Sequence, residues 1–144
     1  MRYKAPDNQR GLAVIELVLV TPLIIIFMAL FLEVGSFFID HQTLNKMVRN
    51  GARHAVTEVY GTVGGGIADT DEIKNLVVYG VRSGGTESLL DGVTVDDVTV
   101  VEAGSLITVS ANYTYSPLYS TIPFLTQALS VTMSASAIME KRDD

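Results

Sequence analysis

Residues 10–32 read RGLAVIELVLVTPLIIIFMALFL, and this stretch determines how the rest of the chain is arranged. From Leu12 to Leu32 it holds 21 residues with one ionisable side chain, Glu16. As an α-helix, a segment of this length rises roughly 32 Å, which is about the thickness of the hydrocarbon core of a bilayer. The stretch therefore predicts a transmembrane helix over residues 12–32.

The short segment before this helix is basic. Residues 1–11 contain Arg2, Lys4 and Arg10 against a single acid, Asp7. Basic segments that flank a membrane helix stay in the cytoplasm. We therefore expect a cytoplasmic N-terminus, with everything after the helix on the far side of the membrane.

Two features distinguish this helix from a plain anchor. A carboxyl group such as that of Glu16 costs about 2.5–3.5 kcal/mol near the centre of a membrane helix, and less toward its ends, so it needs a partner. Pro22 has no N–H, which leaves the Val18 carbonyl without its helical donor. The Thr21 hydroxyl is a candidate donor to that carbonyl, and we expect a helix kink at Thr21 and Pro22.

A cleaved secretory signal is the first alternative for this segment. Such signals have an apolar region of about 7–15 residues followed by a small-x-small cleavage site. The run here is longer, and no Ala-x-Ala follows it. An uncleaved membrane anchor remains a second alternative.

The helical pattern continues beyond the span to about Tyr60. Gly35 and Gly51 interrupt it and mark either a bend or a close helix contact. We expect residues 33–60 to extend the span as an amphipathic helix. Its apolar stripe recurs at steps of three and four residues and comprises Val34, Phe37, Phe38, Leu44, Met47, Val48, Ala52, Ala55, Val56 and Val59.

Residues 61–144 read as one small α+β domain. The glycines of residues 61–66 have P-loop spacing, but Ile67 and Ala68 stand where a P-loop needs Lys and Ser or Thr, so we interpret the segment as a hinge. Asp69 and Glu72 have the spacing of a capping box and predict a short helix over 70–82. Clustered acids at 69–72 and 96–97 also suggest calcium, but no loop of alternating ligands follows them, so we expect no metal.

Beyond Gly92 the period of the pattern changes to two. Alternating apolar residues predict strands at about 93–101, 106–115 and 129–139, with a bulge at Asp96-Asp97 and a hairpin turn at 102–105. We expect an α+β fold in which the long N-terminal helix packs on a small antiparallel three-stranded sheet, with one short extra helix. The apolar, proline-containing loop 116–125 covers a core edge or touches another subunit.

Composition excludes several classes of function. The 144 residues include no Cys, so neither disulfides nor thiol chemistry are available. After residue 11 the chain holds seven of the ten basic and fifteen of the sixteen acidic residues, a net charge of −8 that disfavours nucleic acid as a partner. His41 and His54 lie on different helix faces without a Ser or Cys nucleophile, so we expect surface histidines, no cofactor and no enzyme activity.

The N-terminal pattern resembles a known class. A basic leader ending in Gly11, then Leu12 and a hydrophobic helix with Glu16 as its fifth residue, is similar to the prepilins cut by prepilin peptidase. Together with Val14 and Pro22, the small and basic run 47–55 and the strand-loop-strand tail, it resembles the TadE-like minor pseudopilins of tight-adherence (Flp-type, type IVc) pili. Leu17 departs from the aromatic residue that often follows the glutamate in this class.

The resemblance carries several expectations. It implies a pilin-like subunit of the bacterial inner membrane, cut between Gly11 and Leu12, whose C-terminal domain is periplasmic. Glu16 would pair with the N-terminal ammonium of a neighbouring subunit, and Arg49 and Arg53 would lie at a helix-packing interface. The implied partners are prepilin peptidase, other minor pseudopilins, the major pilin, the inner-membrane assembly platform and membrane lipid. The alternative is an uncleaved membrane scaffold or adaptor of the same machinery.

Overall fold

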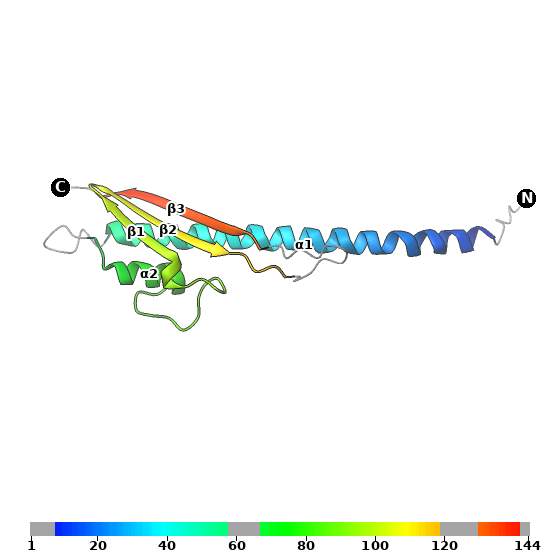
Figure 1. Ribbon diagram of the computed structural model, residues 1–144, viewed down its shortest axis with the longest axis horizontal. Coiled ribbons are helices and arrows are strands. Elements are labelled where there is room, and N and C mark those ends of the chain that lie inside the picture. The colour runs from blue at the N-terminus through cyan, green and yellow to red at the C-terminus, as the bar shows by residue number, and fades with distance from the viewer. Residues whose placement is uncertain (1–7, 58–66, 119–129, 142–144) are drawn as a thin grey trace, which may run out of the picture.

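The computed structural model describes residues 8–57, 67–118 and 130–141. Over these residues the chain is α+β, and three antiparallel strands form one sheet in the order β1-β2-β3. This confirms the predicted fold class (Figure 1). The elements are α1 (Asn8–Thr57), α2 (Thr70–Tyr79), the short 3-10 helix η2 (Val95–Asp97), β1 (Val98–Ala103), β2 (Leu106–Thr114) and β3 (Thr132–Glu140).

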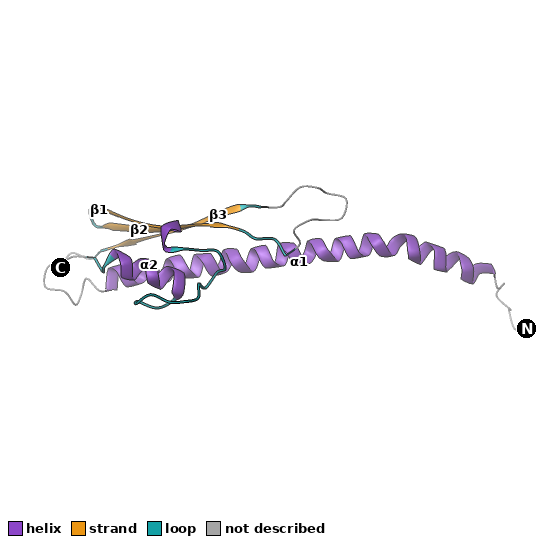
Figure 2. Cartoon of the chain, turned by 60° about the horizontal axis from the view of Figure 1, so that its bottom comes forward, coloured by secondary structure: helices purple, strands orange, loops and turns teal. Residues whose placement is uncertain are grey.

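Helix α1 is the axis of the molecule. It holds 50 residues in one helix that includes Pro22. Its N-terminal half extends away from the other elements, while its C-terminal half lies along the sheet and α2 (Figures 1 and 2). The end predicted near Tyr60, and most of the predicted leader 1–11, lie outside the described residues.

The core forms where α1, α2 and one face of the sheet meet. In β2 the inward side chains alternate with exposed ones, which confirms the pattern predicted for this strand. Helix α2 packs along α1 and also contacts β1. The largest fully buried side chains are Leu44, Met47 and Val48 of α1, Ile73, Val77 and Val78 of α2, and Val98, Ile107 and Val109 of the sheet.

Strand β1 begins later than predicted. Instead of a bulge, residues 95–97 form η2, because the Asp97 carboxylate accepts hydrogen bonds from the Thr94 N–H at 2.9 Å and the Thr94 hydroxyl at 2.8 Å. The hairpin turn is also shorter than the four residues expected. Ala103 pairs with Leu106, and Gly104 takes a φ of 64°, so Gly104 and Ser105 alone make the turn.

Helix α2 begins at the predicted position but ends earlier. The Asp69 side chain accepts from the Asp71 N–H at 3.2 Å, so the cap is a single side chain rather than the reciprocal box expected with Glu72. Gly80 adopts a left-handed φ of 72°, and its N–H bonds to the Leu76 carbonyl. This glycine cap stops the helix at Tyr79.

The buried stripe of α1 differs from the predicted one near the membrane. Val34 and Phe38 are exposed, and Phe37 is only partly buried. At this level Tyr115, which follows β2, contacts the side of α1 that carries Glu33 and Phe37. Val34 and Phe38 each lie about 100° further around the helix and therefore point away from the sheet. Val59 lies outside the described residues.

Candidate functional site

The predicted cleavage and pairing residues lie on the open surface of α1. Gly11, Leu12 and Glu16 are all exposed. A Cβ atom built on Gly11 would meet nothing within 4 Å. Within the described part of the chain, the Glu16 carboxylate has no hydrogen-bond or ion-pair partner. These residues are thus available to a partner outside the chain.

Thr21 uses a different acceptor from the one predicted. Its hydroxyl donates to the Leu17 carbonyl at 2.6 Å, not to the Val18 carbonyl. A threonine in a helix reaches the carbonyl four residues earlier readily, and this kind of bond often bends the helix slightly. The helix continues through Pro22 and curves gently along its N-terminal half (Figure 2).

The apolar surface of α1 is long enough to cross a bilayer. Among the described residues α1 is the one helix with this length and composition. None of its most apolar window is buried within the molecule. Exposed apolar side chains continue past the predicted span, with Val34, Phe38 and Ile39 more than half exposed. The surface suited to lipid therefore reaches about residue 39 on the side of α1 that faces away from the sheet.

Two tyrosines form hydrogen bonds to α1 between residues 33 and 40. The Tyr113 hydroxyl donates to the Asp40 carboxylate at 3.2 Å, and the Tyr115 hydroxyl donates to the Glu33 carbonyl oxygen at 3.4 Å. The Phe37 ring packs edge-on against Tyr115, with centroids 5.5 Å apart. We call these five residues the junction, because they join the apolar half of α1 to the folded domain.

Burial changes the acidity of both junction tyrosines. It raises the pKa of Tyr113 above its ordinary value of 10, and the nearby Asp40 carboxylate raises it further. Burial together with Glu33 raises the pKa of Tyr115 to about 12. A tyrosinate at either position would be desolvated and would face a carboxylate. Both hydroxyls therefore remain protonated donors at neutral pH.

Glu33 is the residue that the sequence reasoning missed. It is 9% exposed, and its two carboxylate oxygens are buried without a hydrogen-bond partner among the described residues. The sequence did contain a signal for the burial of Glu33, since this residue follows the apolar run and lies four residues before Phe37. An acid at that spacing belongs to the buried stripe of the helix.

The two helices meet around Gly51. A Cβ atom on Gly51 would collide with the Val77 side chain, so the glycine is what allows α2 to approach. His54 lies on the same side of α1, and its Nε2 is 3.8 Å from the Glu72 carboxylate. The prediction of a surface histidine was therefore wrong for His54, which is buried because α2 covers this side of α1.

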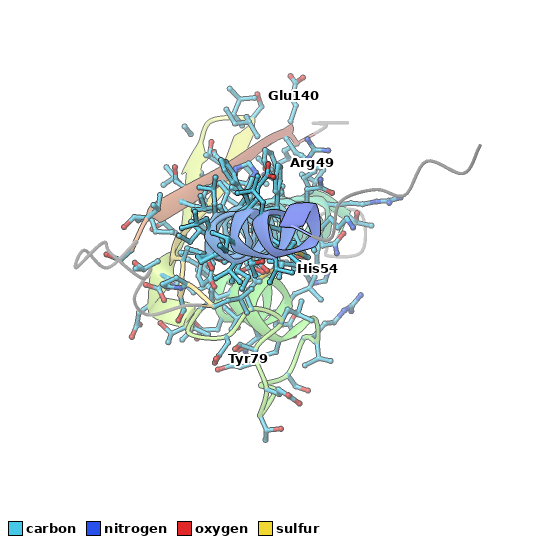
Figure 3. All side chains as sticks on the ribbon, turned by 90° about the vertical axis from the view of Figure 1, so that its right-hand side faces the viewer. Arg49, His54, Tyr79 and Glu140 are labelled. Atoms are coloured by element: carbon cyan, nitrogen blue, oxygen red, sulfur yellow. The ribbon has the colours of Figure 1, made fainter. Side chains whose placement is uncertain are left out.

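Arg49 and Arg53 lie on another side of α1. Both are exposed, as is Lys46. In the view along α1, Arg49 is labelled above the helix and His54 below it (Figure 3). No ion pair involves these three cations within the described residues. Among the residues that the structure describes, the two arginines thus leave their charged groups exposed.

The acidic clusters have structural roles at helix ends. Asp69 caps α2, and Asp97 fixes η2 through Thr94. Across residues 8–57, 67–118 and 130–141, no three His, Asp or Glu side chains come together as a metal site would need.

The comparison with protein families covers the first part of the chain. The family model described as TadE-like protein matches residues 11–53. The match begins at Gly11 and includes Glu16, Pro22 and most of α1. No curated protein and no solved structure matches the chain significantly. The match confirms the predicted resemblance to the TadE-like family over residues 11–53, a stretch that includes the part of α1 long and apolar enough to cross a membrane.

Proposed function

We propose that the chain is a minor pseudopilin, a structural subunit that primes or caps a tight-adherence pilus after prepilin peptidase cuts between Gly11 and Leu12. The observation that carries the proposal is the exposed surface of α1 over residues 12–32, where the lone carboxylate of Glu16 has no partner among the described residues. The family match that begins at Gly11 supports the same reading.

Glu16 would supply the assembly contact. Cleavage would leave an α-ammonium on Leu12, and an ammonium and a carboxylate are each costly in hydrocarbon. Pairing them between two subunits offsets part of both costs and fixes the register of the helices. Because Leu12 and Glu16 are four residues apart, pairing would offset neighbouring subunits by about 6 Å along the helix axis.

The rest of the proposal follows the basic leader and the family. The subunit would cross the bacterial inner membrane once, with its N-terminus in the cytoplasm and the α+β domain in the periplasm. Its partners would be prepilin peptidase, other minor pseudopilins, the major pilin, the inner-membrane assembly platform and the surrounding lipid. The alternative, an uncleaved scaffold of the same machinery, would share this topology but keep its leader.

The N-terminal sequence of the protein isolated from membranes tests this proposal. Processing predicts Leu12 as the first residue, and Gly11→Ala should slow its appearance in a pulse-chase. A mature chain that starts at Met1 would favour the scaffold.

A second experiment tests the pairing itself. Glu16→Ala should leave insertion and cleavage intact but abolish association with other pilus subunits, because the ammonium of the neighbour would lose its counter-charge. Leu17→Ala is the matched control, since it removes an exposed apolar side chain one position away. Normal piliation with Glu16→Ala would contradict the pairing.

A further inference from the structure

The C-terminal part of α1 carries a basic face. At 100° per residue, Lys46, Arg49 and Arg53 fall within about 60° of one another around the helix. All three are exposed. Residues 41–57 contain these three basic residues and no Asp or Glu. We call Lys46, Arg49 and Arg53 the basic face.

The segment that packs on the other side of α1 has the opposite charge. Residues 67–97, which include α2 and η2, contain seven acidic and two basic residues, a net charge of −5. Asp69, Asp71, Asp91 and Asp96 are exposed. His54 contacts α2 through Glu72, and Figure 3 labels Arg49 above α1 and His54 below it. The domain is therefore positive on one side of α1 and negative on the other.

The height of these charges above the membrane limits what the basic face can bind. If lipid reaches Ile39, the last strongly exposed apolar residue of α1, Arg49 and Arg53 stand about 15 and 21 Å beyond it. The Debye length at physiological ionic strength is about 8 Å. Anionic lipid headgroups are thus too distant to hold the two arginines.

A second copy of the chain presents acids at the right height. Helix α2 packs on its own α1 at Gly51 and His54, so the acidic N-terminal end of α2 lies level with Arg53. Copies in one membrane have parallel helices that start at the same depth. The exposed Asp71 of one copy and Arg53 of its neighbour therefore stand at similar heights, to within the roughly 6 Å offset that pairing at Glu16 would add.

We propose that the basic face of one copy binds the acidic end of α2 on a second copy. Because the two surfaces lie on different sides of α1, the contact is head-to-tail. The acidic end of α2 on the first copy and the basic face of the second copy stay free to bind further copies. Complementary charge mainly sets which surfaces meet and in what register. The contact needs only parallel copies in one membrane and does not depend on cleavage at Gly11.

Disulfide cross-linking in intact membranes tests the contact, because the chain has no cysteine of its own. One full-length copy carries Asn50→Cys beside the basic face, and a second, differently tagged copy carries Thr70→Cys beside Asp71. Both positions are exposed. We expect the two tags to be joined in one cross-linked product, with a lower yield at high salt.

Substitutions that reverse the charge of Arg53 or Asp71 then test whether these two residues form the contact. Arg53→Glu in the Asn50→Cys copy should lower the yield about fivefold, the loss expected for an exposed ion pair turned repulsive. Asp71→Arg in the other copy should restore it. Glu140→Arg makes the same charge change on exposed β3 and should not restore it.

Three results with the two tagged copies would overturn the proposal, and a fourth would come from a different partner. The three are the absence of the mixed cross-link, a yield unaffected by Arg53→Glu, and equal rescue by Glu140→Arg. Cross-linking of Asn50→Cys to a different protein instead would also count against a second copy. N-terminal sequencing of the same samples reports cleavage separately, so failure of this contact and failure of the proposed function are distinguishable.

Discussion

Glu33 is an acid buried without a partner at the point where α1 leaves its apolar stretch. A buried polar group that lacks hydrogen bonds costs about 1–3 kcal/mol, and more when charged. Glu33→Met keeps a straight, helix-compatible side chain and removes that cost. We therefore expect the substitution to raise the free energy of unfolding by about 1–3 kcal/mol, measured by urea unfolding in detergent micelles.

The exposed Glu140 supplies the control for this prediction. Glu140→Met should change the free energy of unfolding by less than about 0.5 kcal/mol, because an exposed carboxylate is already hydrated. A loss of stability on Glu33→Met would contradict the prediction and would mean that the carboxylate is held by a partner.

The junction tyrosines predict a dependence of stability on alkaline pH. Folding raises the pKa of Tyr115 from 10 to about 12, so the folded chain holds this proton more tightly than the unfolded chain. The resulting stabilisation is complete below pH 10 and is lost as pH rises from about 10 through about 12. Tyr113 contributes in the same direction.

Tyr115→Phe isolates this effect. We expect the urea midpoint of the variant to fall less steeply than that of the wild type between pH 10 and 12, because the variant has no phenol to ionise at this site. Below pH 9 the variant should be less stable, since its Glu33 carbonyl loses a donor. Parallel midpoint curves above pH 10 would refute the role assigned to Tyr115.

At the scale of the elements, two glycines of α1 have opposite surroundings. A Cβ atom on Gly51 would collide with the stiff, buried Val77, whereas one on Gly35 would meet nothing within 4 Å. Gly35→Ala should stabilise the helix by up to about 1 kcal/mol. Gly51→Ala gains the same propensity but forces α1 and α2 apart, at a cost of about 1–3 kcal/mol.

Paired melting curves in detergent measure this difference. Gly35→Ala should raise the melting temperature, and Gly51→Ala should lower it. If both variants melt above the wild type, the α1–α2 contact is looser than the structure indicates. If both melt below it, helix propensity is not what limits α1 at residue 35.

How accurately the sequence predicts the bounds and burial of an element depends on which interactions determine them. The continuation of α1 beyond its apolar stretch and the alternation of β2 are set by local pattern, and both were recognised from the sequence. The start of β1 was missed because Thr94 and Asp97 hydrogen-bond locally and turn the chain before the strand begins. The burial of His54 was missed because it depends on α2, which packs across a glycine that the sequence could mark only as a bend or a contact.

At the scale of the molecule, residues related by their spacing in the sequence could be predicted, whereas residues that meet only in the folded chain could not. Gly11, Leu12 and Glu16 are predicted as cleavage and pairing residues from a prepilin-like spacing, which a sequence displays directly. The junction unites Glu33 and Tyr115, which are 82 positions apart, and Asp40 and Tyr113, which are 73 apart. Such pairs exist only once the sheet has docked on α1, so no local pattern could reveal them.

The separation of α1 into an exposed apolar half and a packed half predicts that the domain folds without the membrane. Every buried apolar residue described lies at or after Leu44, and none comes from the apolar stretch before it. A fragment that begins at Leu32 keeps this core and all five junction residues. We expect it to be soluble and to unfold cooperatively in urea, with the near-ultraviolet circular dichroism of packed tyrosines. A gradual, non-cooperative transition would show instead that the bilayer, or the rest of α1, is needed to hold the sheet and α2 together.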